Sequence, residues 1–352
     1  MAFRLKGFRS LWGTPTAERL LASKARHSAG NPSPTAAASY GEKLAAHIAA
    51  QGYDGIEASL SDLDLIGGPT VVKELLAKHD MQLIVGVYSG WTDYEDANLS
   101  EQFEGVTRHL ARYREQLERV CEHFPRGEDE ADSPLVWINA HSGSDHWGKL
   151  DQMEFIAHAL EIETQLEVDN LSHETHRGRI FYSPWPTLEL LEAFPSLKLT
   201  LDMSHWCVVT ERLLDTTFDD TWLQRVMRHV WHVHGRMGTA QSSQIPHLPG
   251  HRVVEQEVER FERLWEAIWR HQFSRFHASV DLKDVDPLWK RPFATFTPEY
   301  GPIPYAPRDA QEPTREAYDV DALCEQQMDR QRERFAGLMQ EKAAEEAAKA
   351  YA

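Results

Sequence analysis

The sequence predicts an α/β protein: a single (β/α)8 TIM barrel with a long C-terminal helical extension. Two observations support this prediction. Short apolar runs alternate with amphipathic stretches along most of the chain, which is typical of repeated βα units around a parallel sheet. In addition, residues of metal-ligand type stand at the carboxyl ends of four predicted strands, and such ends meet where a barrel closes.

Eight strands are expected, each from a short apolar run. They cover Phe3–Phe8, Tyr53–Ala58, Leu83–Tyr88, Leu135–Ala140, Asp169–Glu174, Leu197–Asp202, Val230–His234 and Ala294–Glu299. Between them, apolar residues recur at three- and four-residue spacing, which predicts helices. These helices include Gly41–Gln51, Thr70–His79, Ser100–Phe124, Asp151–Leu166 and Val254–Gln272.

The eighth strand has a competitor at 276–285, which is also strand-like and would offer Asp281 in place of Glu299. We prefer the later segment because its polar residues Thr295, Thr297 and Glu299 share one face of a strand. A stretch rich in Gly and Pro follows it and suits a loop over the barrel mouth.

The chain is expected to form one catalytic barrel domain, residues 1–308, followed by a C-terminal helical extension, residues 309–352. The Ala-, Ser- and Pro-rich stretch 27–39 and the charged stretch 125–134 are interpreted as loops rather than domain boundaries. The extension is rich in Glu, Gln, Arg, Lys and Ala, so a long helix is predicted. Together with the 11 tryptophans it favours a homodimer.

Composition excludes several classes of function. The net charge of −18, from 55 acidic and 37 basic residues, would repel a nucleic acid backbone, so no nucleic acid partner is expected. The chain has no Gly-rich phosphate loop, which argues against a nucleotide cofactor. No run of about 18 apolar residues is present to span a membrane, and three cysteines without CxxC spacing suggest reduced thiols. A cytoplasmic protein is therefore expected.

Side chains two residues apart on a strand point to the same face, so parity tests whether the polar residues can converge. Three consecutive strands pass this test. Their pairs are Ser172 with Glu174, Thr200 with Asp202, and His232 with His234. A barrel packed only for stability has branched apolar residues inside, so this polar interior predicts a ligand cavity.

Each of these residues alone has an ordinary explanation, such as a helix cap, a surface charge or a hydrogen-bonded core histidine. Their combination favours one divalent metal ion with carboxylate and imidazole ligands. Mn²⁺, Co²⁺, Mg²⁺, Fe²⁺ and Zn²⁺ all accept such ligands, and the residues leave the choice open.

The ordered set resembles the xylose isomerase-like barrel superfamily. It comprises Glu174, then Asp202-x-x-His205, then His232-x-His234, then Glu299. That superfamily includes tagatose/psicose 3-epimerases, inosose dehydratases, 3-dehydroshikimate dehydratases and type-IV AP endonucleases. The phrases HETHRGR, SHW, HGRMG and TPEYGPIPY resemble a subgroup described as sugar phosphate isomerase/epimerase-like, and the resemblance covers Tyr53–Tyr305.

By position, the resemblance implies four metal ligands: Glu174, Asp202, His234 and Glu299. It also implies that His205 and Arg236 contact substrate and that His232 lines the cavity one layer deeper. Further substrate-binding candidates are His141, His176 and Trp91. Other residues near the expected mouth are Glu57, Tyr88, Asp145 and Arg177.

The resemblance implies an isomerase or epimerase that transfers a proton α to a carbonyl on a sugar, cyclitol or related polyol. Glu174 and Glu299 would act on opposite faces of a metal-stabilised enediolate. The expected partner is a small polyol or keto compound, and manganese is among the expected metals.

Three alternatives remain open. A lyase would expel a β-hydroxyl from the same intermediate, and a non-catalytic barrel would bind metal without turnover. AP endonuclease-like hydrolysis of a phosphodiester needs a trinuclear zinc site with an Asp-x-His after strand seven. At that point this chain has GTAQSSQIPH, and its negative charge also argues against a nucleic acid substrate.

Overall fold

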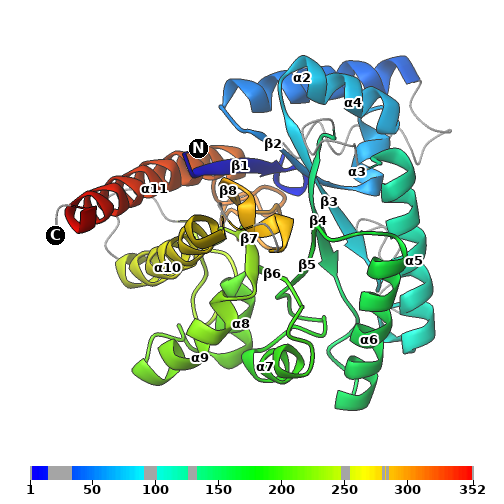
Figure 1. Ribbon diagram of the computed structural model, residues 1–352. Helices are drawn as coiled ribbons and strands as arrows, with labels where there is room; N and C mark the ends of the chain where they lie inside the picture. Colours follow the sequence, from blue (N-terminus) through cyan, green and yellow to red (C-terminus); the bar gives the residue numbers. More distant parts are fainter. Residues whose placement is uncertain are drawn as a thin grey trace.

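The computed structural model describes residues 2–14, 34–90, 101–125, 133–246, 254–279, 282 and 285–350. Eight parallel strands close into a barrel in chain order, each paired with the next and β8 with β1 (Figure 1). Helices surround the sheet on its outer side. The predicted fold class is confirmed.

All eight predicted strands are present. Their bounds are β1 Arg4–Ser10, β2 Gly55–Ser59, β3 Gln82–Tyr88, β4 Leu135–His141, β5 Leu171–Glu174, β6 Leu199–Leu201, β7 Val230–His234 and β8 Phe293–Thr297. The outer faces of the strands pack against the helices, and the buried apolar residues between them form one continuous core.

The α-helices of the described residues include every helix that the sequence predicted. Their bounds are α2 Pro34–Ala50, α3 Leu60–Leu65, α4 Gly68–Lys78, α5 Val106–His123, α6 Lys149–Gln165, α7 Pro184–Ala193, α8 Met203–Thr210, α9 Thr217–Met227, α10 Glu255–Ser279 and α11 Val320–Ala350. None of the helices in this part of the chain has the length and apolar character that a membrane span needs. The three cysteines are free thiols.

Three expectations need correction. Residues Pro34–Ser39, expected in a loop, begin α2. Strand β6 ends before Asp202, because the Asp202 side chain accepts a hydrogen bond from the Ser204 N–H and so caps α8. Strand β8 ends at Thr297, because the next residue is a proline without an N–H to continue the ladder.

The preference for the later eighth strand is confirmed. Helix α10 continues through Ser279, so the first part of the competing segment is helical. Asp281 lies outside the described residues.

The barrel interior changes from apolar to polar along its axis. Near the amino-terminal ends of the strands, Phe8, Ile84 and Trp137 form a buried apolar cluster. Towards the carboxyl ends, the Trp137 Nε1–H donates to Ser172 Oγ at 2.5 Å, and Ser172 Oγ lies 2.6 Å from Thr200 Oγ1. The apolar cluster thus lies beneath a layer of polar side chains inside the barrel.

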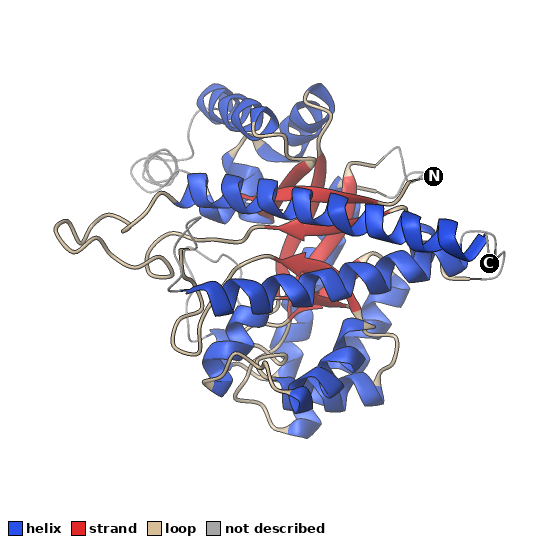
Figure 2. Ribbon diagram, turned by 90° about the vertical axis from the view of Figure 1, so that its left-hand side faces the viewer, coloured by secondary structure: helices blue, strands red, loops and turns tan. Residues whose placement is uncertain are grey.

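Helix α11 packs directly on the barrel. It lies beside α10 across one face of the molecule (Figure 2). Glu262 of α10 accepts hydrogen bonds from Arg330 Nε at 2.5 Å and from Gln331 Nε2 at 3.0 Å. Asp321 pairs with the buried Arg9 of β1 at 2.9 Å. The boundary at residue 309 stays a prediction.

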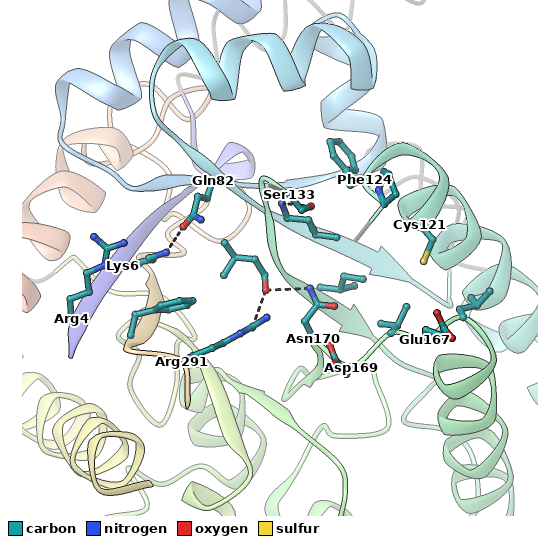
Figure 3. Close-up of a pocket in the computed structure, with 17 residues that line it drawn as sticks. Arg4, Lys6, Gln82, Cys121, Phe124, Ser133, Glu167, Asp169, Asn170 and Arg291 are labelled. Carbon is teal, nitrogen blue, oxygen red and sulfur yellow. Dashed lines mark hydrogen bonds between the residues drawn. The ribbon is translucent and has the colours of Figure 1, made fainter. Parts of the chain in front are cut away.

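A cavity of about 610 Å³ lies at the amino-terminal end of the barrel, where the strands begin. Figure 3 shows the side chains that line it. Lys6, Gln82, Asn170 and Arg291 are among the residues that line it. Lys6 donates to Gln82, and both Asn170 and Arg291 donate to the carbonyl of Val136. These polar side chains are therefore already engaged with neighbouring strands.

Gly235, directly after β7, lies close to Phe296 of β8, and substitution can test this close approach. A Cβ on Gly235 would lie 1.9 Å from the Phe296 ring, whereas a Cβ on Gly337 in α11 would have no atom of the described structure within 4 Å. We expect Gly235→Ala to destabilise the protein by about 1–3 kcal/mol through overpacking. Gly337→Ala should stabilise it by about 0.5–1 kcal/mol, because alanine favours a helix interior. Thermal unfolding followed by circular dichroism measures both, and equal melting temperatures would contradict the close approach.

Candidate metal centre

Four neighbouring strand ends position the expected metal ligands. Glu174 is the last residue of β5, His234 is the last of β7, Asp202 directly follows β6, and Glu299 stands two residues beyond β8. One ligand atom from each of the four side chains lies within 4.8 Å of the others. The structure thus brings together the whole ligand set that the sequence singled out.

The donor atoms of this set fit a divalent cation. Glu174 Oε1, His234 Nδ1 and Glu299 Oε2 are buried and have no hydrogen-bond partner among the described residues. His234 Nδ1 lies 3.1 Å from Glu299 Oε2 and 3.6 Å from Glu174 Oε2, without the alignment of a hydrogen bond. Buried polar atoms left unpaired are costly, and a metal ion between these atoms would satisfy all three.

The charge of the site also favours a bound cation. Glu174, Asp202 and Glu299 lie together in this site, and the Arg236 guanidinium lies 2.5 Å from Asp202 Oδ2 and 3.5 Å from Glu299 Oε2. Burial raises the pKa of Asp202 to about 6; Arg236 opposes this rise and Glu299 adds to it. Burial would lower the pKa of His234, but the surrounding carboxylates, Glu299 foremost, raise it well above its usual range. The site therefore attracts positive charge, which a divalent ion would supply.

Arg236 is buried inside the site and contacts protein groups. Its Nη2 donates to Asp202 Oδ2 at 2.5 Å and to His205 Nε2 at 2.6 Å, and it lies 3.5 Å from Glu299 Oε2. Its Nε donates to Ser204 Oγ at 3.2 Å. These contacts orient the Asp202 carboxylate. A contact between Arg236 and substrate stays a prediction.

Three of the predicted substrate-binding histidines form one wall beside Glu174. His141 Nε2 lies 2.8 Å from Glu174 Oε2. The rings of His141 and His176 are 5.1 Å apart, and those of His176 and His205 are 3.8 Å apart. Burial and neighbouring positive groups lower the pKa of both His176 and His205, which favours neutral rings that can accept or donate hydrogen bonds. Their role in substrate binding stays a prediction.

Two aromatic residues that the sequence analysis did not single out stand next to this wall. The rings of Trp12 and Tyr305 meet edge to face with centroids 4.9 Å apart. Arg236 lies over the Tyr305 ring at 4.8 Å, and Tyr305 Oη is 3.4 Å from His176 Nε2. These residues follow β1 and β8, which are adjacent only because the barrel closes.

A buried polar layer lies beneath the ligands. Asn139 Nδ2 donates to Glu174 Oε2 at 2.7 Å. Glu57 Oε1 accepts from His234 Nε2 at 2.9 Å, and Glu57 Oε2 lies 3.2 Å from His232 Nε2. His232 belongs to this layer, and its role in lining the substrate cavity stays a prediction. Asn139 was missed, although it shares the parity of His141 on β4.

The remaining candidate residues differ in where they lie. Asp145 is exposed, and Tyr88 packs its ring 4.5 Å from that of His141. Arg177 lies over the Tyr305 ring at 4.9 Å. Trp91 lies outside the described residues.

Metal binding gives the direct test of this geometry. We expect the wild-type protein to bind one Mn²⁺ per chain and Glu299→Gln to weaken that binding at least about tenfold, because an amide is a poorer ligand than a carboxylate. Calorimetric titration of metal-free protein measures both. Glu163→Gln is the matched control, since Glu163 is a buried carboxylate outside the site that accepts from Tyr113 Oη at 2.7 Å. Equal affinities for wild type and Glu299→Gln would contradict the proposed ligand set.

Comparison with known proteins supports the fold. No protein-family model and no curated protein matches the chain. The solved structure of a D-allulose 3-epimerase from Methylomonas sp. in complex with D-allulose is similar, with 15% identity and a TM-score of 0.55 over 94% of this chain and 99% of that one. An L-ribulose 3-epimerase is also similar, with 13% identity and a TM-score of 0.52 over 100% of this chain and 99% of that one. The chain thus shares the barrel fold of these two solved structures.

Proposed function

We propose that the protein is a divalent-metal-dependent isomerase or epimerase acting on a sugar, cyclitol or related polyol. The observation that carries the proposal is the convergence of Glu174, Asp202, His234 and Glu299, three of them with buried ligand atoms that lack a hydrogen-bond partner in the described structure. Such a mixed carboxylate and imidazole set suits Mn²⁺, Co²⁺, Mg²⁺, Fe²⁺ or Zn²⁺.

The reaction we propose is proton transfer at the carbon next to a carbonyl group. A divalent ion at this site would polarise the carbonyl and stabilise the negative charge that develops when the proton leaves. Glu174 and Glu299 come from strands separated by two others in the barrel, so they can approach a substrate from different directions. One carboxylate would take the proton from one face, and the other would supply a proton to the opposite face.

Neighbouring residues prepare the two carboxylates for this role. Asn139 and His141 hold Glu174 Oε2 at 2.7 and 2.8 Å, which leaves Glu174 Oε1 without a partner in the described residues. Arg236 Nη2 lies 3.5 Å from Glu299 Oε2. Each carboxylate is thus oriented by groups that do not need to move during the reaction.

The comparisons support the substrate class. Both similar structures are named as 3-epimerases of ketoses, D-allulose and L-ribulose, and both match almost the whole chain. At 15% and 13% identity they do not identify the substrate of this protein, so we propose a ketose or a related keto polyol as a class.

Solvent exchange tests the proposal. Metal-loaded protein is incubated with a panel of ketoses and inososes in D₂O, and NMR follows deuterium entering the carbon next to the carbonyl. We expect exchange with at least one compound. Glu174→Gln and Glu299→Gln should each lower the rate by about 10²–10⁴-fold, the usual contribution of a general acid or base. Glu163→Gln is expected to exchange like wild type.

The same experiment separates the alternatives. Exchange in both glutamine variants at the wild-type rate would rule out the two glutamates as the acid and base. A new ultraviolet absorbance, from a double bond conjugated to the carbonyl, would identify a lyase instead. Metal binding without exchange on any compound would favour a non-catalytic barrel.

A further inference from the structure

His234 stands between the expected metal position and a buried carboxylate that is not one of the four ligands. Its Nδ1 faces Glu299 and Glu174, whereas its Nε2 donates to Glu57 Oε1 at 2.9 Å. Because a carboxylate oxygen can only accept this hydrogen bond, Nε2 must carry a proton, so a neutral His234 ring presents the Nδ1 lone pair to the site. Glu57 thereby selects which nitrogen of His234 can bind a metal.

Glu57 is itself held in place from several sides. Thr297 Oγ1 donates to Glu57 Oε2 at 2.6 Å, and Asn139 Nδ2 approaches Glu57 Oε1 at 3.3 Å. His232 Nε2 lies 3.2 Å from Glu57 Oε2, and His232 Nδ1 lies 2.8 Å from Thr295 Oγ1. All of these side chains are buried, so the carboxylate has little freedom to turn.

Strands β2, β4, β7 and β8 contribute to this network, which runs across the barrel interior directly below the ligands. The register of β7 and β8 places His232 beside Thr295 and His234 beside Thr297. The donors that orient Glu57 and the ligand that Glu57 orients therefore come from paired positions of the same two strands.

We propose that Glu57 is a positioning residue for the metal ligand His234, and that His232 and Thr297 brace it. This inference rests on the metal centre of the proposed function and deepens it. Glu57 touches neither the metal nor the substrate in this account. It acts through the His234 ring, in the way that hydrogen-bonded carboxylates orient metal-binding histidines generally.

Two substitutions of similar size separate orientation from simple packing. Glu57→Met removes both acceptor oxygens and keeps most of the volume, whereas Glu57→Gln keeps one acceptor. We expect Glu57→Met to weaken Mn²⁺ binding by about 10–100-fold and Glu57→Gln to retain most of the affinity. Calorimetry on the full-length, metal-free protein measures this without any substrate.

A spectroscopic measurement reports on the ring directly. In Zn²⁺-loaded protein labelled with ¹⁵N-histidine, the Nε2–H resonance of His234 is assigned by its loss in His234→Asn. We expect a downfield, slowly exchanging signal in wild type and Glu57→Gln. In Glu57→Met the signal should move upfield or exchange away. A role in packing alone would leave it unchanged.

Thr297→Val is a second variant in case Glu57→Met does not fold. It removes one donor to Glu57 and leaves the Glu57–His234 contact, so metal affinity should fall by a few-fold. Glu163→Gln again serves as the control for a buried carboxylate outside the network.

Three results would overturn the inference. In the first, a folded Glu57→Met binds Mn²⁺ within twofold of wild type, and the proposed function stands without this role for Glu57. In the second, wild type binds two ions and Glu57→Met binds one, which would make Glu57 a ligand. In the third, wild type binds no divalent ion, and the metal centre of the proposed function fails as well. If Glu57→Met weakens Mn²⁺ binding but the wild-type protein turns over no polyol, the result would support the inference and contradict only the proposed reaction.

Discussion

The structure depends on burying several carboxylates at one end of a closed barrel. Glu57, Glu174 and Asp202 are almost fully buried, and Glu299 lies within reach of the last two. Negative charges that are this close together and buried away from water repel one another unless positive charge lies among them. Arg236 supplies one such charge, and a divalent ion would supply the rest. In this account the metal therefore contributes to the stability of the site as well as to its chemistry.

The barrel interior provides polar partners for these buried carboxylates in one layer and apolar packing in another. The apolar cluster around Phe8, Ile84 and Trp137 is buried in the barrel interior below the site. Above it, hydroxyl, amide and imidazole groups provide the hydrogen bonds that the carboxylates need. Hydrogen bonds to ionised groups are stronger than those between neutral groups, and rigid donors hold the ligands in one geometry.

Much of this arrangement could be predicted from the sequence. Strand β7 matched its predicted range, and Glu174 and His234 end their strands as expected. Short apolar runs and parity are local properties, so they can be recognised in one chain. The partners of Glu57 could not be recognised in this way, because His232 and His234 lie 175 and 177 residues further along the chain. The contact between Arg236 and Asp202 could not be recognised either, because it joins residues 34 positions apart.

The position of a bound metal ion would show whether these four residues form the metal site. Crystals of the protein soaked in Mn²⁺ would show the ion by its anomalous scattering. We expect one peak about 2.0–2.3 Å from oxygens of Glu174, Asp202 and Glu299 and from His234 Nδ1. A peak between Glu57, His232 and His234, or no peak at the carboxyl ends of the strands, would contradict it.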